Sequence, residues 1–343
     1  MLQFKLSSAQ IQAIRFPYGF KSSDLVYSLM VSDNKLTLGV KMLEGGIAWV
    51  EIPVNVNTNG KEICVGVNER LRNIPLGDYD ISVDDKQVIF ECVGNKYVFP
   101  IHNNYSRFAM PENTVYDGNI PLSFNELLKS FERVSTKMGG TYPFIINPDS
   151  AMYVATSNVA CSAVWKDVLK LIDNELILKR EGLIPMAKYF NSLSGFSGSV
   201  SYTIAKDKFC TFKFQDSGIS YYLQLASHTL TRKVTIPASS NTTFGIGKDF
   251  WESMQLMTSL SGAKAQCLVS DNGSTYIFDD ATGSKRNITI DGTLSEKFIY
   301  AVEDIQGFVP PIPMQVSLDE KASFFIYDSG DYKITVILAR IQG

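Results

Sequence analysis

Hydrophobic and polar residues alternate along most of the chain, and short polar turns interrupt this alternation. Ile81 and Val83 alternate with polar residues before one such turn. Val88, Phe90 and Cys92 alternate in the same way after it. A period of two places the apolar side chains on one face of a strand, so the pattern predicts a β-hairpin. Six hairpin turns are expected, at 31–36, 83–88, 146–151, 205–209, 270–274 and 318–322.

Short helical patterns lie between these hairpins at a regular spacing. The expected helices begin near Ser8, Asn68, Ser123, Gly182, Lys248 and Ser295, 47 to 66 residues apart. A fixed period of this size indicates a repeated supersecondary structure, here a strand, a short helix and three further strands. Six such βαβββ repeats can stack in pairs, with two helices on one face and two sheets behind them. We therefore expect three domains, at 1–114, 115–236 and 237–343.

The third of these helices carries a stripe of basic residues. Ser123 and Glu126 have the spacing of a capping box, which predicts the helix start. Lys129, Arg133 and Lys137 follow at intervals of four residues, so their charges line up along one face. Such a stripe is most often a solvated helix face. A surface that contacts phosphate is the alternative.

The overall composition narrows the class of protein without changing this picture. Hydrophobic residues make up 45% and charged residues 20% of the 343 positions, which is ordinary for a soluble globular protein. A net charge of −3 argues against a surface that is basic throughout but allows a locally basic channel. The sequence predicts no membrane-spanning helix and no signal peptide. Lys5 and Arg15, with no acid before Asp24, leave a transit peptide open.

The cysteines and histidines do not indicate a metal or catalytic site. The five cysteines are far apart in sequence, and no pair has the spacing of a zinc or redox motif, so we expect reduced thiols and a cytoplasmic location. His102 and His228, the two histidines, are also remote from one another. The stretch FGIGKDF (244–250) lacks the spacing of a phosphate-binding loop. We therefore expect no enzyme activity, no cofactor and no metal.

Several segments resemble one known family in the order in which they occur. The clearest is 67–101, which contains a short helix, the turn Pro75-Leu76-Gly77-Asp78, a hairpin and the exit Phe99-Pro100. Further similar segments are 28–54, 152–158, 231–237 and 331–343. On these segments the chain resembles a bacterial-type β sliding clamp, a processivity factor of DNA polymerase. It departs from the family at 157–160 and 337–340, which is typical of a divergent member, bacterial or viral.

The resemblance implies an α+β protein with the DNA-clamp fold. In that fold, three domains of two βαβββ repeats each place their sheets outside and their helices around the lumen of a ring. The resemblance further implies a ring-shaped homodimer in the cytoplasm that encircles duplex DNA without reading its sequence. In DNA replication such a ring tethers the DNA polymerase. Polymerase and clamp loader bind it through short peptide motifs.

Basic residues on the expected helices are the candidate DNA contacts. They are Arg15, Lys21, Arg70, Arg72, Lys129, Arg133, Lys137, Lys188 and Lys248. The fifth helix is balanced in charge, because Asp249 and Glu252 accompany Lys248. The sixth, starting at Ser295, is acidic. The third domain therefore fits a basic lumen least well.

A pocket for partner peptides is expected between the second and third domains. The resemblance places in its wall Thr156, Val159, Cys161, Arg232, Val234, Tyr300, Phe324, Leu338, Ala339, Arg340 and Ile341. An apolar cleft of this kind takes aliphatic or aromatic anchors of a peptide. The alternative interpretation of 334–341 is a buried strand. For the whole chain, the alternatives are a clamp-fold interaction or structural subunit that does not encircle DNA, and an unrelated all-β or α+β protein.

Overall fold

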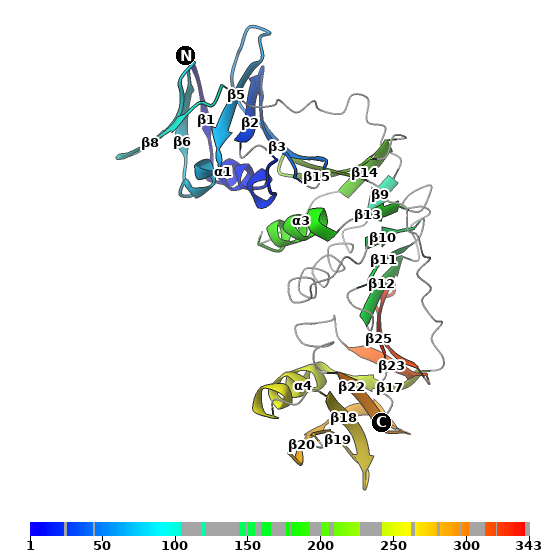
Figure 1. Cartoon of the computed structure of the whole chain (residues 1–343). Coiled ribbons are helices and arrows are strands. Elements are labelled where there is room, and N and C mark those ends of the chain that lie inside the picture. Colours follow the sequence, from blue (N-terminus) through cyan, green and yellow to red (C-terminus); the bar gives the residue numbers. More distant parts are fainter. Residues whose placement is uncertain are drawn as a thin grey trace. The chain divides into compact units, whose positions relative to one another are not determined.

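The computed structural model divides the chain into two compact lobes (Figure 1). The first lobe comprises Met1–Leu122 and Glu181–His228, and the second comprises Ser123–Arg180 and Thr229–Gly343. The residues that the structure describes are 1–23, 26–43, 45–103, 118–120, 144–147, 150–154, 159–165, 176–178, 180–192, 200–205, 209–226, 242–261, 265–279, 282–294, 296–301, 313–319 and 321–339.

The first lobe contains a four-stranded and an eight-stranded antiparallel sheet. Their orders are β1-β6-β7-β8 and β5-β2-β3-β4-β16-β15-β14-β9. The strands are β1 (Leu2–Leu6), β2 (Val26–Ser32), β3 (Lys35–Lys41), β4 (Ile47–Pro53), β5 (Ile63–Asn68), β6 (Tyr79–Val83), β7 (Gln87–Cys92), β8 (Asn95–Pro100), β9 (Gly118–Ile120), β14 (Val200–Ala205), β15 (Phe209–Asp216) and β16 (Ile219–Ala226). The helices described in this lobe are α1 (Ser8–Ile14), the 3₁₀ helices η1 (Pro17–Gly19) and η2 (Glu69–Asn73), and α3 (Arg180–Ser192).

The second lobe contains a nine-stranded and a four-stranded antiparallel sheet. Their orders are β13-β10-β11-β12-β25-β24-β23-β17-β21 and β20-β19-β18-β22. The strands are β10 (Phe144–Ile146), β11 (Ser150–Val154), β12 (Val159–Trp165), β13 (Leu176–Leu178), β17 (Thr242–Ile246), β18 (Ala265–Asp271), β19 (Ser274–Asp279), β20 (Ser284–Ile288), β21 (Ile290–Gly292), β22 (Phe298–Ala301), β23 (Met314–Leu318), β24 (Ala322–Asp328) and β25 (Tyr332–Ala339). The helix described in this lobe is α4 (Lys248–Ser261).

All six expected hairpins are confirmed. They join β2 to β3, β6 to β7, β10 to β11, β14 to β15, β18 to β19, and β23 to β24. In the fifth, Asn272 and Gly273 have φ angles of 48° and 80°. Two consecutive positive φ angles match the twist of the flanking strands, which is why Asn-Gly is favoured in two-residue hairpin turns.

The strands also pair between repeats in a reciprocal way. The first strand of one repeat pairs with the second strand of the next, and the reverse pairing joins the same two repeats. This relationship holds for β1–β6 with β5–β2, for β9–β14 with β13–β10, and for β17–β23 with β22–β18. The expected association of βαβββ repeats in pairs is therefore present in the sheet topology. The domain boundaries at 114/115 and 236/237 lie outside the described residues and stay a prediction.

Two helices cover one face of the eight-stranded sheet. Ser7 caps α1 with a capping box to Gln10, and the helix buries Ile11, Ala13 and Ile14. Phe16 follows α1 and places its ring 5.2 Å from that of Tyr189 on α3 and 5.4 Å from that of Tyr221 on β16. The Tyr189 hydroxyl also donates to the Gln12 carbonyl at 3.0 Å. Aromatic packing and this hydrogen bond thus hold α1, α3 and the sheet together.

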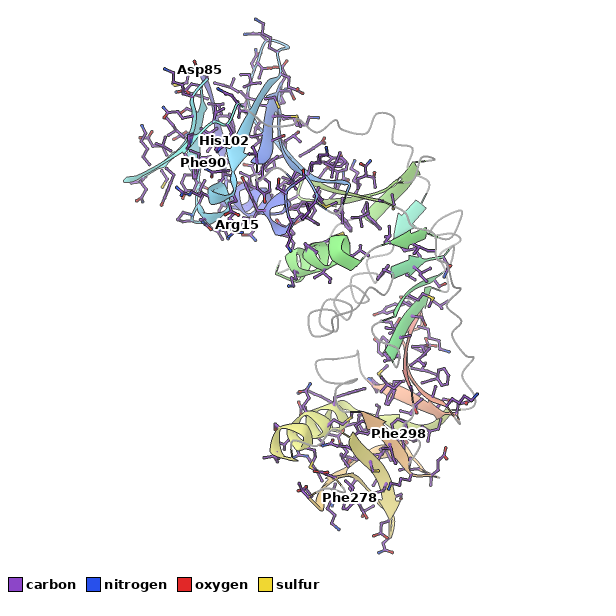
Figure 2. All side chains as sticks on the ribbon, viewed as in Figure 1. Arg15, Asp85, Phe90, His102, Phe278 and Phe298 are labelled. Atoms are coloured by element: carbon purple, nitrogen blue, oxygen red, sulfur yellow. The ribbon has the colours of Figure 1, made fainter. Side chains whose placement is uncertain are left out.

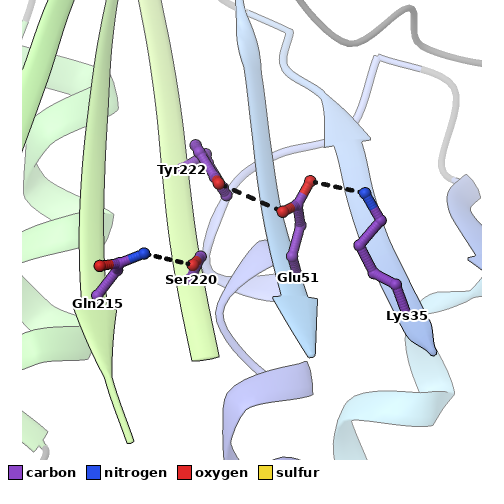
Figure 3. A network of polar contacts seen from close by, with 5 residues as sticks. All are labelled: Lys35, Glu51, Gln215, Ser220 and Tyr222. Atoms are coloured by element: carbon purple, nitrogen blue, oxygen red, sulfur yellow. Dashed lines mark hydrogen bonds and ion pairs between the residues drawn. The ribbon is translucent and has the colours of Figure 1, made fainter. Parts of the chain in front are cut away.

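The opposite face of the same sheet carries a polar network over the junction of β4 and β16 (Figure 3). The Tyr222 hydroxyl donates to Glu51 at 3.3 Å, and Lys35 lies 3.5 Å from the other carboxylate oxygen of Glu51. Gln215 donates to Ser220 at 3.2 Å one strand away. These contacts connect strands that are far apart in sequence.

In the second lobe, α4 packs on the nine-stranded sheet. The rings of Phe250 and Trp251 lie 6.1 and 5.4 Å from the ring of Phe325 on β24. Phe298 on β22 lies 6.3 Å from the same ring, so Phe325 brings the helix and both sheets of this lobe into contact. Phe298 is labelled in Figure 2.

The helix expected from Ser295 is wrong over the part that the structure describes. Residues Phe298–Ala301 form strand β22, in which Phe298 pairs with Leu268 and Tyr300 with Gln266. Phe298 and Tyr300 are both buried, which is the alternation of a strand. Ser295 and 302–312 lie outside the described residues. The helix expected near Asn68 is the short 3₁₀ helix η2, with Asn68 as its N-cap.

Candidate nucleic-acid interface and peptide site

Four candidate DNA contacts are exposed on or beside the helices of the first lobe. Lys21 follows η1, Arg70 and Arg72 lie on η2, and Lys188 lies on α3. Within the described part of the chain, none of these four side chains forms an ion pair. Their charges are therefore available to an anionic partner from solvent.

Contacts within the lobe connect the elements that carry these residues. The Tyr18 hydroxyl on η1 donates to the carbonyl of Asn68, the N-cap of η2, at 3.4 Å. Tyr189 joins α3 to α1, as described above. The cations thus belong to one packed set of helical elements rather than to isolated loops.

Arg15, by contrast, is engaged within the protein. It ends α1, where Figure 2 labels it, and donates from Nη2 to the Ile74 carbonyl at 2.8 Å and from Nη1 to Gln12 at 3.4 Å. Its Nε is buried. A cation at a helix C-terminus also interacts favourably with the helix dipole. Arg15 therefore links α1 to the segment after η2, which limits its reach toward DNA.

Lys248, on the first turn of α4, forms an ion pair within the protein. Its Nζ lies 2.7 Å from Glu252 Oε1, and this carboxylate raises the pKa of Lys248. Asp249 accepts a hydrogen bond from the Thr289 amide at 3.1 Å. Lys129, Arg133 and Lys137 lie outside the described residues.

The expected peptide-pocket residues are divided between the two faces of the nine-stranded sheet. Strand β25 lies between β12 and β24, with Cys161 opposite Val336 and Val336 opposite Phe325. Residues paired across strands share a face, so Cys161 lies on the Phe325 face, which α4 covers. Leu338 lies on this same face, two positions after Val336. Val159 pairs with Leu338 in the register.

Phe324 and Ala339 lie on the other face of the sheet. Phe324 pairs with Ile337, and a buried apolar cluster forms there from Ala322, Phe324, Ile326 and Ile337. Ile326 and Ile337 were not among the expected pocket residues, although the alternation along 322–328 and 332–339 could have indicated them. Tyr300 lies in a different sheet, where burial raises the pKa of its hydroxyl. Thr156, Arg232, Val234, Arg340 and Ile341 lie outside the described residues.

The described residues contain no group of three or more His, Cys, Asp and Glu side chains that could hold a metal ion. No helix in the described part of the chain is long and apolar enough to cross a membrane. His102 donates its backbone amide to the Gly66 carbonyl at 2.9 Å and so extends the pairing at the edge of β5.

Comparison with known proteins identifies the fold that carries these residues. No protein-family model matches the chain, and no curated protein sequence matches it. The β clamp of Helicobacter pylori bound to a DNA ligase peptide matches with a TM-score of 0.70 at 12% identity, over 99% of this chain and 100% of that one. A DNA polymerase sliding clamp of Pseudomonas aeruginosa matches with 0.71 at 11% identity, over 100% of both chains. That of Bacillus subtilis matches with 0.70 at 12% identity, over 100% of this chain and 99% of its own.

Identities this low establish architecture alone, and the similar architecture extends along the full length of both partners in each comparison. The expected α+β class and clamp topology are confirmed. The chain has the DNA-clamp fold and is similar in structure to bacterial β sliding clamps from end to end.

Proposed function

We propose that this chain is a sliding clamp that encircles duplex DNA and tethers a replicative DNA polymerase for processive synthesis. The observation that carries this proposal is the whole-length structural likeness to β clamps of three bacteria. The proposed role is that of a non-enzymatic binding protein in the cytoplasm, without a cofactor.

The proposed DNA contacts are phosphate contacts made by exposed cations. Lys21, Arg70, Arg72 and Lys188 support this proposal, because they are exposed on one packed set of helical elements. The basic stripe of Lys129, Arg133 and Lys137 belongs to the same proposal on sequence grounds. Contacts to phosphate carry no base readout, so they hold DNA without fixing the protein at one sequence, as sliding requires.

We propose that two copies close the ring through the outer edges of the four-stranded sheets. β8 is an edge strand on which Val98 is 49% exposed, and β20 is an edge strand whose residues 284–287 are exposed. Unpaired edges are ready to pair with another chain. Pairing of β8 in one copy with β20 in its partner, at both ends of a twofold-symmetric dimer, leaves neither edge open.

We propose that partner peptides bind near the C-terminal strand β25. The buried cluster of Ala322, Phe324, Ile326 and Ile337 makes that face of the sheet apolar, and we propose that hydrophobic anchors bind beside this cluster. Arg340 and Ile341, which follow β25 in sequence, would extend it. The similar Helicobacter pylori clamp was solved with a DNA ligase peptide, which supports peptide recognition as the mode of partner binding.

Light scattering combined with particle imaging tests this proposal. A closed dimer has a mass of about 76 kDa, twice the 38.1 kDa of one chain, and its particles show a central hole wide enough for duplex DNA. A stable monomer without such a hole would contradict the proposal. That result would favour a clamp-fold interaction or structural subunit that does not encircle DNA.

A further inference from the structure

The sequence contains two asparagines that are followed directly by glycine, Asn59-Gly60 and Asn272-Gly273. Asparagine is a thermally labile residue, because the backbone nitrogen of the next residue can attack its side-chain amide carbon. A following glycine leaves this nitrogen unhindered, since glycine has no side chain. Each pair therefore has the sequence that favours deamidation, a covalent modification that needs only water.

The two pairs have the same local backbone and the same access to solvent. Asn59 and Gly60 have φ angles of 56° and 72°, and Asn272 and Gly273 have φ angles of 48° and 80°. All four residues are exposed. A Cβ on either glycine would meet open space. Backbone conformation and contact with water therefore do not distinguish the two pairs.

Hydrogen bonds to one carboxylate hold the first pair. The Gly60 amide, which is the attacking group, donates to Asp33 Oδ2 at 3.1 Å. The amide and hydroxyl of Thr58 donate to the same carboxyl and lower its pKa, and the Gly60 amide lowers this pKa further. A carboxyl with a lowered pKa is a weak base, so it accepts a hydrogen bond from the Gly60 amide without removing the proton. Its negative charge also opposes the amide anion that must form before the attack.

The second pair has no such restraint. Asn272 and Gly273 form the two-residue turn between β18 and β19, flanked by the paired residues Asp271 and Ser274. In the described part of the chain, neither the Gly273 amide nor the Asn272 side chain makes a hydrogen bond. The attacking nitrogen and the side-chain amide therefore break no bond within the protein before they meet.

We propose that Asn272 is the site of deamidation in the folded protein and that Asp33 protects Asn59 from the same reaction. The Gly273 nitrogen loses its proton and bonds to Cγ of Asn272, and the side-chain nitrogen leaves as ammonia. The product is a cyclic succinimide. One water molecule then opens the ring at either carbonyl and gives aspartate or isoaspartate. No oxidant or reductant takes part.

Either product changes the hairpin between β18 and β19. Aspartate adds a negative charge beside Asp271, whose carboxylate accepts a hydrogen bond from the Tyr276 hydroxyl at 3.1 Å. Isoaspartate adds one carbon atom to the main chain of the turn. The turn then no longer has the two-residue geometry that matches the twist of the flanking strands.

The experiment follows both asparagines in the full-length protein during incubation at physiological temperature and mildly alkaline pH. The water is enriched in oxygen-18, so that each newly converted residue carries the heavy isotope and is identified by mass spectrometry of its peptide. The same incubation in guanidinium chloride gives the two rates without the fold. Asp33→Ala frees the Gly60 amide, and Asp85→Ala is the matched control at another exposed aspartate. Circular dichroism checks that each variant is folded.

We expect Asn272 to convert about ten to a hundred times faster than Asn59 in the folded protein, because a hydrogen bond to an ionised carboxylate must break before Asn59 reacts. In guanidinium chloride the two rates should be similar. Asp33→Ala should raise the rate at Asn59 and leave that at Asn272 unchanged, whereas Asp85→Ala should change neither.

Three results would overturn the proposal. One is conversion of Asn59 as fast as that of Asn272 in the folded protein, or no conversion at Asn272. Another is an equally large difference between the two rates in guanidinium chloride, because the fold would then not be its cause. The last is an unchanged rate at Asn59 in folded Asp33→Ala. If that variant does not fold, the comparison of the unsubstituted protein with and without guanidinium chloride still decides.

Discussion

The indole of Trp49 lies parallel to the phenol ring of Tyr222, with 4.6 Å between the ring centroids and 3° between the planes. Trp49 is on β4 and Tyr222 on β16, and the two are direct partners in the register. Met30 belongs to the same hydrophobic cluster, and all three are buried. This stack stabilises the contact between β4, which follows β2 and β3 in the sequence, and β16, which comes much later in the sequence.

Trp49→Ala is expected to lower the free energy of unfolding by about 3–5 kcal/mol, because it removes a buried aromatic side chain and leaves a cavity. The matched control is Tyr222→Phe, which keeps the stack and loses only the hydrogen bond to Glu51, at about 0.5–1.5 kcal/mol. Urea unfolding measures both. Equal effects of the two substitutions would show that the stack does not stabilise the junction of β4 and β16.

Gly46 tests the same junction of β4 and β16 through the backbone. Gly45 and Gly46 have φ angles of 88° and 96°, so alanine is strained at both, by about 1–2 kcal/mol. A Cβ at position 45 would meet open space, whereas one at position 46 would collide with the Gln224 carbonyl on β16. Gly46→Ala is therefore expected to destabilise the protein by about 1–3 kcal/mol more than Gly45→Ala in thermal or urea unfolding. Equal losses would mean that β4 and β16 do not approach as closely as described.

Asp33 is expected to make stability depend on acid pH. Its carboxylate accepts hydrogen bonds from the amide and hydroxyl of Thr58 and from the amide of Gly60, and these bonds lower its pKa. A lowered pKa in the folded state means that the ionised form stabilises the fold. This contribution is present above the ordinary pKa of 3.8 and is lost as the pH falls through the folded-state value.

Unfolding measured from pH 6 downward checks this sign. Asp33→Asn is expected to be less stable than the unsubstituted protein at pH 6, and the difference should shrink below about pH 4. The matched control is Asp85→Asn, which also removes one negative charge from an exposed aspartate. A difference that grows as the pH falls would contradict the assignment.

The edge strand β8 is expected to determine the oligomeric state. Val98→Lys places a charge on the proposed pairing edge, which opposes strand addition, so the mass in solution should fall from about 76 to about 38 kDa. Val93 is fully exposed on the tight turn between β7 and β8, away from the paired positions. Val93→Lys should therefore leave the mass unchanged. A dimeric Val98→Lys variant would place the contact between copies elsewhere.

The parts of the fold that were predictable from the sequence depend on local interactions. The hairpins follow from turn residues and alternation within a few positions, as at Asn272 and Gly273. Helix α1 follows from its capping box, and the pairing of Lys248 with Glu252 follows from their four-residue spacing. Each of these features is determined within about one turn or one hairpin of chain.

The parts that were not predictable depend on partners distant in sequence. Phe298 and Tyr300 form a strand because β18 pairs with them, and the residues around them resemble a helix start when considered alone. Arg15 was expected to contact DNA, but the Ile74 carbonyl that holds it lies on another repeat. The pocket residues were assigned by family resemblance, and only the register of β12, β25 and β24 assigns Cys161 and Phe324 to opposite faces.

Topological retention on DNA tests the central claim most directly. Labelled protein is diluted to separate the copies, reconcentrated with nicked circular DNA so that rings close around it, and washed in high salt, which removes proteins held by charge alone. If the chain forms a ring around DNA, it stays on the circle through the wash and leaves when a restriction enzyme linearises the DNA. Loss of the protein from intact circles in the wash, or retention on the linear DNA after cutting, would contradict encirclement.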